Sequence, residues 1–158
     1  MEIERKFTIK ELPKNLSEYK CLALEQGYLN TNPVVRVRKE DDNYYLTYKG
    51  KGFLEREEYN LPLNEEAYKH LVAKADGNII SKSRYCIPYS CTDLAGKVCE
   101  YTIELDVFKA PFEGLIIAEV EFESVEDAHN FVAPEWFLED VTEDRQYSNS
   151  ELSKRSFN

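Results

Sequence analysis

Charged side chains recur at every second position in short runs along the chain. Glu2, Glu4 and Lys6 form the first run, and Glu119 and Glu121 belong to another late in the sequence. Lys and Arg hold phosphate oxygens well, whereas carboxylates bind hard cations such as Mg²⁺ through oxygen. A site that combines both types could hold a polyanion together with a divalent metal ion.

The same alternation extends over seven strand-like segments. Residues two apart in a strand point to the same face of the sheet, so each run places its charges on one face and its apolar residues on the other. The further pairs are Arg36 and Arg38, Thr47 and Lys49, Arg56 and Glu58, Lys82 and Arg84, and Glu104 and Asp106. In a single strand this pattern is typical of a half-buried strand with its charges in water. Seven strands together favour a shared charged surface.

The rest of the sequence predicts an α+β fold. Strands are expected at residues 1–7, 21–30, 34–40, 43–50, 54–63, 79–87, 98–108 and 115–123, and helices at 64–75, 124–131 and 148–156. About eight strands are enough to close a barrel. We therefore predict an eight-stranded antiparallel closed β-barrel, with a few helices packed outside and a C-terminal helix, and we expect residues 1–158 to form a single domain.

If the apolar faces pack outward, the charged faces line the barrel interior. The cations are then Lys6, Arg36, Arg38, Lys49, Arg56, Lys82 and Arg84, and the carboxylates are Glu2, Glu4, Glu58, Glu104, Asp106, Glu119 and Glu121. Such burial requires that the charges be paired or bound to a metal or ligand. Membrane barrels also have a polar inside, but these strands lack aromatic girdles and the helices would have no place to pack.

Composition excludes several classes of function. The net charge of −10 and the pI of about 4.8 argue against nucleic acid or an anionic membrane as the main partner. No apolar run is long enough to cross a bilayer and none resembles a signal peptide, so we expect a cytoplasmic protein. The four cysteines lack CxxC spacing, which favours reduced thiols. His70 and His129 fall in expected helices away from the charged strands.

An ordered set of motifs resembles the CYTH domain of the triphosphate tunnel metalloenzyme family. "EIERK" matches its Glu-x-Glu-x-Lys signature, and "QGYL", "RVR", "TYK", "EREEY", "KSR", "ELDVF" and "EVEF" follow in the family's order. "VTEDRQYSN" resembles the C-terminal segment of the short bacterial members, which are similar to inorganic triphosphatases.

The resemblance implies a metal-dependent enzyme that hydrolyses a triphosphate, most specifically inorganic tripolyphosphate to pyrophosphate and phosphate, with Mg²⁺ or Mn²⁺ as cofactor. Its implied metal ligands are Glu2, Glu4, Glu119 and Glu121. Its implied phosphate-binding residues are Lys6, Arg36, Arg38, Lys49, Arg56, Lys82 and Arg84. Lys6, Glu58 and Lys82 are the catalytic candidates, and the general base stays open among the interior carboxylates.

Several alternatives stay open at this point. Family members also act as adenylyl cyclases, thiamine triphosphatases or nucleoside triphosphatases, and a non-catalytic polyphosphate-binding module would keep the same residues. Many members have an acid where this chain has Asn60, a change that could alter a second metal site or the substrate preference. Arg145, Lys154 and Arg155 could contact phosphate from the C-terminal segment, although solvent-facing charges are the usual case. Tyr28, beside Gly27, could reach the ligand, although ordinary sheet packing is the usual case, and the oligomeric state is not predicted.

Overall fold

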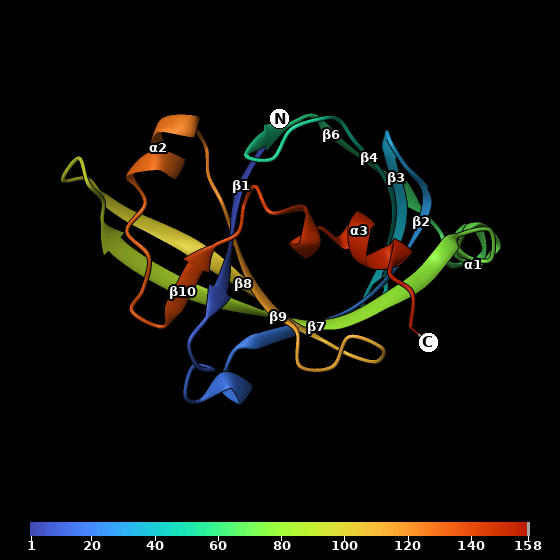
Figure 1. Ribbon diagram of the computed structural model, residues 1–158, viewed down its shortest axis with the longest axis horizontal. Coiled ribbons are helices and arrows are strands. Elements are labelled where there is room, and N and C mark those ends of the chain that lie inside the picture. Colours follow the sequence, from blue (N-terminus) through green and yellow to red (C-terminus); the bar gives the residue numbers. More distant parts are fainter. Residues whose placement is uncertain (158) are drawn as a thin grey trace.

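The structure, a computed structural model, describes residues 1–157 as one large antiparallel sheet with short helices (Figure 1). The strands are β1 (Glu2–Ile9), β2 (Lys20–Thr31), β3 (Val34–Glu40), β4 (Asn43–Lys49), β5 (Glu55–Arg56), β6 (Glu58–Leu63), β7 (Asp76–Thr92), β8 (Val98–Phe108), β9 (Ile116–Glu121) and β10 (Phe137–Asp140). The α-helices are α1 (Glu65–Val72), α2 (Val125–Asn130) and α3 (Asn149–Lys154), with 3₁₀ turns at Leu16–Glu18 and Arg145–Tyr147. None of the helices in this described part is long and apolar enough to cross a membrane.

The sheet curls into a nearly closed barrel. Its strands follow the order β10-β1-β9-β8-β7-β2-β3-β4-β6, and β5 pairs with β1 to join the two ends. That junction consists of the pairs Glu2 with Arg56 and Ile3 with Glu55, next to a hydrogen bond from the Glu4 amide to the Leu54 carbonyl. Figure 1 shows the resulting ring of strands. The predicted barrel is confirmed, but its closure depends on this short contact.

The turn that leads into the junction requires glycine. Gly52 has φ of +126°, and a Cβ added there would lie 2.2 Å from the Glu55 carbonyl oxygen. Only glycine adopts this backbone conformation without strain. The turn thereby returns the chain from β4 to β5 and brings Arg56 beside Glu2.

The eight predicted strands are all present, but the strand count of eight is wrong. The segment 54–63 is divided at Glu57 into β5 and β6, and β10 lies between the expected helices 124–131 and 148–156, where no strand was predicted. β10 has four residues and pairs with the far end of β1 through Phe7 with Asp140 and Ile9 with Phe137, so its signal in the local sequence is weak. The helix expected at 64–75 ends at Val72, and the strand expected to begin at 79 already begins at Asp76.

The main hydrophobic core lies on the outer surface of the barrel wall. Ile3, Phe7 and Val120 point outward from β1 and β9 and pack against Phe131 and Phe137. Phe131 directly follows α2, and Phe137 is the first residue of β10. Side-chain N-caps begin both covering helices: Ser124 accepts from the Asp127 amide at α2, and Asn64 accepts from the Ala67 amide at α1. The outward apolar faces are thus covered as predicted.

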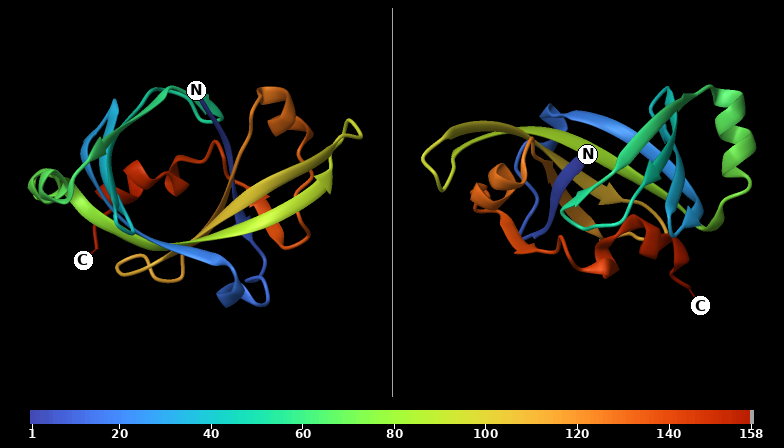
Figure 2. Two further views of the ribbon diagram at one scale, coloured as in Figure 1. Left: turned by 180° about the vertical axis from the view of Figure 1, so that it is seen from behind. Right: turned by 90° about the horizontal axis from the view of Figure 1, so that it is seen from above.

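A second apolar cluster occupies the inside of the barrel at one end. Tyr28, Ile80, Phe108 and Ile117 pack there with Leu152 of α3. In Figure 1, α3 crosses within the outline of the ring, and the view from above in Figure 2 places it to one side of the strands. The expectation that the inner face is charged throughout is therefore wrong at this end, where α3 needs apolar residues against which to pack.

Candidate functional site

The strand register brings every predicted site residue to the inner face. Glu4 pairs with Glu121, and Lys6 pairs with Glu119 across β1 and β9. Other pairs in the register are Tyr28 with Arg36, Lys49 with Glu58, Arg84 with Asp106, and Glu104 with Glu119. Because directly paired residues share a face, each strand contributes its alternate charged positions to one chamber.

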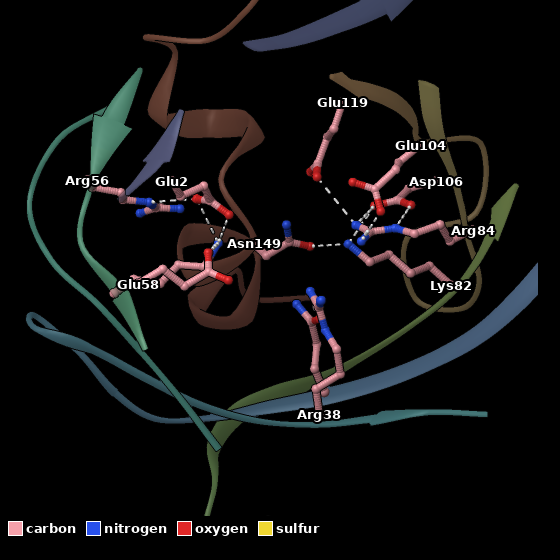
Figure 3. Close-up of polar contacts among 12 residues, drawn as sticks. Glu2, Arg38, Arg56, Glu58, Lys82, Arg84, Glu104, Asp106, Glu119 and Asn149 are labelled. Carbon is pink, nitrogen blue, oxygen red and sulfur yellow. Dashed lines mark hydrogen bonds and ion pairs between the residues drawn. The ribbon is translucent and has the colours of Figure 1, made fainter. Parts of the chain in front are cut away.

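One part of the chamber is a largely buried ion-pair network. The Asp106 carboxylate lies 2.7 Å from Lys82 Nζ, and it accepts two hydrogen bonds from the Arg84 guanidinium at 2.8 and 2.9 Å. Arg84 also pairs with Glu104 at 2.9 Å and with Glu119 at 3.3 Å (Figure 3). Despite the cost of burial, Arg84 and Lys82 hold the pKa of Asp106 below its usual value.

Lys82 is the most enclosed cation of this network. Its side chain is fully buried, and its Nζ also donates to Asn149 Oδ1 of α3 at 3.2 Å. Burial lowers the pKa of Lys82 to about 8, although Asp106 opposes the shift. This hydrogen bond connects α3 to a buried charged residue of the barrel.

A second network lies across the chamber, on the other side of the ring (Figure 3). Lys49 Nζ lies 3.2 Å from Glu2 and 3.4 Å from Glu58, and Arg56 pairs with Glu2 at 3.5 Å. Asn60 donates to Glu58 at 2.9 Å. Contacts from Glu2, Lys49 and Asn60 outweigh the cost of burial and lower the pKa of Glu58, which is therefore ionised at neutral pH.

Three cations in the chamber have no carboxylate partner. Within residues 1–157, the side chains of Lys6, Arg36 and Arg38 form no ion pair, and Arg38 donates instead to Gln26 Oε1 at 2.8 Å. Arg36 is buried, and its Nε has no hydrogen-bond partner. Burial, and then repulsion from Arg36 and Arg84, lowers the pKa of Arg38 to about 10. Buried cations without partners are costly, so their presence favours a function that needs them.

Two groups of carboxylates lie in the same chamber, and among the described residues Glu4 and Glu121 of these groups form no ion pair. The oxygens of Glu2, Glu4 and Glu121 approach one another within 4.8 Å, as do those of Glu4, Glu104 and Glu119. Burial followed by repulsion from Glu119 raises the pKa of Glu4 well above its usual value. Burial and neighbouring carboxylates, beginning with Glu104, raise the pKa of Glu121 to about 7. Glu4 belongs to both groups of acids.

These two groups fit the requirements of a hard divalent cation. Each offers three oxygen donors close enough to share one ion, and the repulsion that raises the pKa values of Glu4 and Glu121 would be relieved by a positive charge between them. No thiol or imidazole belongs to either group among the described residues, so the donor set is of the type that suits Mg²⁺ or Mn²⁺. The four predicted metal candidates are thus divided between two adjoining groups.

Sequence reasoning gave no role to several residues of the site. Glu104 and Asp106 were counted among the interior carboxylates, but only the register across β7, β8 and β9 reveals their contacts with Arg84. Asn149 comes from a helix whose docking no local pattern predicts. Tyr28 lies on the inner face, where its hydroxyl accepts from Gln26. His129 lines an outer cavity beside Arg5 and Asp140, away from the chamber.

Comparison with known proteins is consistent with this geometry. The CYTH domain matches residues 1–157. The chain belongs to the CYTH family. A curated relative from Nitrosomonas europaea, named inorganic triphosphatase, is 35% identical over 156 residues and 96% of each chain is covered. Another of that name, from Acetivibrio thermocellus, is 34% identical, covering 99% of this chain and 95% of its own length.

A solved structure has the same fold. The crystal structure of the inorganic triphosphatase NE1496 superposes with a TM-score of 0.67 at 33% identity, covering 99% of this chain and 96% of its own. The shared fold therefore extends over nearly the whole length of both chains.

Proposed function

We propose that this protein is a divalent-metal-dependent triphosphatase, and that it hydrolyses inorganic tripolyphosphate to pyrophosphate and phosphate. The observation that carries the proposal is the meeting, in one chamber, of three unpaired cations with two groups of acids suited to a metal. A triphosphate is strongly anionic and requires both cationic contacts and a metal to neutralise the charge that develops on hydrolysis. The relatives named inorganic triphosphatase support this choice of substrate.

In this proposal, Lys6, Arg36 and Arg38 bind the phosphate oxygens directly. They have no carboxylate partner to release, so the triphosphate gains their full attraction, which is stronger at such partly or fully buried positions than in open water. Lys49, Arg56, Lys82 and Arg84 complete the binding surface. They act from fixed positions, because each is already held by a carboxylate of the wall.

The proposed metal ligands are Glu2, Glu4, Glu119 and Glu121, and Glu104 joins them because it lies in the second group. A bound Mg²⁺ or Mn²⁺ would polarise phosphate oxygens and help orient water for attack on the terminal phosphorus. That attack forms a new P–O bond and breaks the P–O–P bridge, so pyrophosphate leaves. Lys6 and Lys82 are the proposed catalytic cations, which stabilise the charge that forms on the transferred and leaving groups.

Glu58 has a different proposed role. Because its pKa is lowered, it is a weak base at neutral pH, and its contacts are with Lys49 and Asn60. We assign it to positioning: its ion pair with Lys49 holds that side chain in place in the chamber. Asn60 supports this arrangement by donating a hydrogen bond to Glu58, which an ionised acid at that position could not do.

Phosphate release tests the function. Tripolyphosphate, ATP and thiamine triphosphate are each supplied with Mg²⁺, with Mn²⁺ or with chelator. The variants are Glu4→Gln, which removes the carboxylate common to both acid groups, and Glu139→Gln, an exposed carboxylate of β10, as the matched control. We expect metal-dependent release from tripolyphosphate that is lost only in Glu4→Gln. Tight binding of tripolyphosphate without release would instead indicate a non-catalytic polyphosphate-binding module, and cyclic AMP formation from ATP would indicate a cyclase.

A further inference from the structure

A large cavity adjoins the chamber at the end of the barrel where α3 lies. It measures about 530 Å³ and is formed by the turn after β4, the turn between β2 and β3, and the segment from Thr142 to Lys154. Lys6, Lys49 and Arg56 line both this cavity and the inner chamber. The cavity, which we call the basic mouth, therefore leads directly to the residues proposed to bind phosphate.

A second cavity of the protein has the opposite charge. The basic mouth has six cationic side chains, Lys6, Lys49, Lys51, Arg56, Arg145 and Lys154, against two carboxylates. A second cavity of about 550 Å³, which includes Glu104 and Glu121, has five carboxylates against the single cation Lys97. In a protein of net charge −10, the basic mouth is a local region that attracts anions, whereas the second cavity, which is acidic, repels them.

Two of the outer cations are free to contact an anion. Lys51 and Arg145 are exposed, and neither forms an ion pair within the described part of the chain. The Arg145 guanidinium lies 5.7 Å from the centre of the Phe53 ring, which restricts its position by a cation–π contact. The neighbouring Asp144 carboxylate accepts from the Gln146 amide, and Lys154 is paired with Glu151 at 2.8 Å. Lys51 and Arg145 are thus the outermost unpaired cations along this route.

We propose that the triphosphate enters through the basic mouth and that Lys51 and Arg145 form an outer phosphate-binding site that captures it first. This inference rests on the proposed function for the identity of the anion. Long-range attraction raises the rate of encounter, and the anion then passes from this outer pair to Lys6, Lys49 and Arg56. The outer pair lies outside the chamber, so it acts on capture and leaves the chemical step to the inner residues.

The test compares two double variants that remove the same charge. Lys51→Gln with Arg145→Gln removes the outer pair. Lys97→Gln with Arg155→Gln removes two exposed cations that do not line the basic mouth. Lys97 lines the acidic second cavity, and Arg155 lies on the C-terminal tail. We expect KM for tripolyphosphate to rise about fivefold in the first variant, with kcat unchanged, because exposed charge contacts are individually weak. The decline of kcat/KM with added salt should also become shallower in that variant.

Equal KM values and salt dependence in the two double variants would overturn the proposed route, even if the wild-type protein hydrolyses tripolyphosphate. If the wild-type protein releases no phosphate, the same comparison is made on the dissociation constant for tripolyphosphate by titration calorimetry. A weaker affinity in the first variant alone would then support the outer site although the proposed function had failed. Equal affinities would reject the outer site. Thermal unfolding of both variants checks that these exposed substitutions leave the fold intact.

Discussion

Replacement of Asp106 by Asn tests how the chamber tolerates its buried charge. The Asp106 side chain is fully buried and contacts Lys82 Nζ at 2.7 Å, Arg84 Nε at 2.8 Å and Arg84 Nη2 at 2.9 Å. Asn preserves the shape but removes the negative charge and directs an amide NH₂ toward one of the two cations. Arg84 then keeps its ion pairs with Glu104 and Glu119, whereas Lys82 keeps no ion pair and only its hydrogen bond to Asn149.

The expected cost follows from the burial of this network. Removing one member of a buried ion pair costs about 3–5 kcal/mol in the free energy of unfolding. Lys82 limits the loss, because its pKa is already lowered to about 8 and it can release its proton when Asp106 no longer stabilises the charge. We therefore expect a loss of about 3 kcal/mol at pH 7. The loss should be smaller at pH 9, where neutral Lys82 is more easily formed.

Urea denaturation measures this loss, with the fluorescence of Trp136, the single tryptophan, and far-ultraviolet circular dichroism as probes. Glu65→Gln is the matched control: Glu65 forms an ion pair with Lys69 at 2.7 Å, but both side chains are mostly exposed, so we expect a change too small to resolve. The reasoning is refuted if Asp106→Asn loses no more stability than this control, or if its loss increases from pH 7 to pH 9.

Three further outcomes follow from the site. Because the pKa of Glu121 is raised to about 7, its proton competes with a metal ion; thermal stabilisation by Mg²⁺ should be greater at pH 8 than at pH 6, and equal shifts would contradict this ligand assignment. Arg36→Met should raise the unfolding temperature of the ligand-free protein, since it removes a buried cation without a carboxylate partner. The same variant should bind tripolyphosphate more weakly in titration calorimetry. A lower unfolding temperature would contradict the stated cost of burying Arg36. Asn149→Ala should lower kcat for phosphate release because Lys82 loses an acceptor, whereas Asn149→Asp, which keeps an acceptor oxygen, should restore it; equal kcat values in both would exclude a positioning role.

The composition of the inner face could be predicted because it depends on a local rule. Alternation within Glu2–Lys6 and Arg36–Arg38 is fixed by the two-residue period of a strand, so the shared face is known without knowing which strands are neighbours. Charged residues on many strands then required a common enclosed space. This reasoning identified every cation of the chamber before any contact between strands was known.

Which of these cations have a carboxylate partner could not be predicted from the sequence. Arg84 is neutralised by Asp106, its register partner across β7 and β8, whereas the register partners of Arg36 are Tyr28 and Thr47, which have no negative charge. The short β10 and the break at Glu57 also escaped prediction, because a four-residue strand and a local interruption of pairing have little signature in composition. The acceptor that Asn149 provides for Lys82 depends on where α3 docks, which is a tertiary property.

The short junction between β1 and β5 has a thermodynamic consequence for the bound state. Glu2 and Arg56 are register partners on opposite sides of that junction, and both face the chamber. An anion held by Arg56 and a cation held by Glu2 would therefore add a contact between β1 and β5 at the junction that closes the barrel. If the ligands bind the closed barrel more tightly than an opened one, the difference in binding free energy stabilises the closed barrel against opening at this junction. The substrate and metal would then act as structural components of the barrel, and the empty protein would be the looser of the two states.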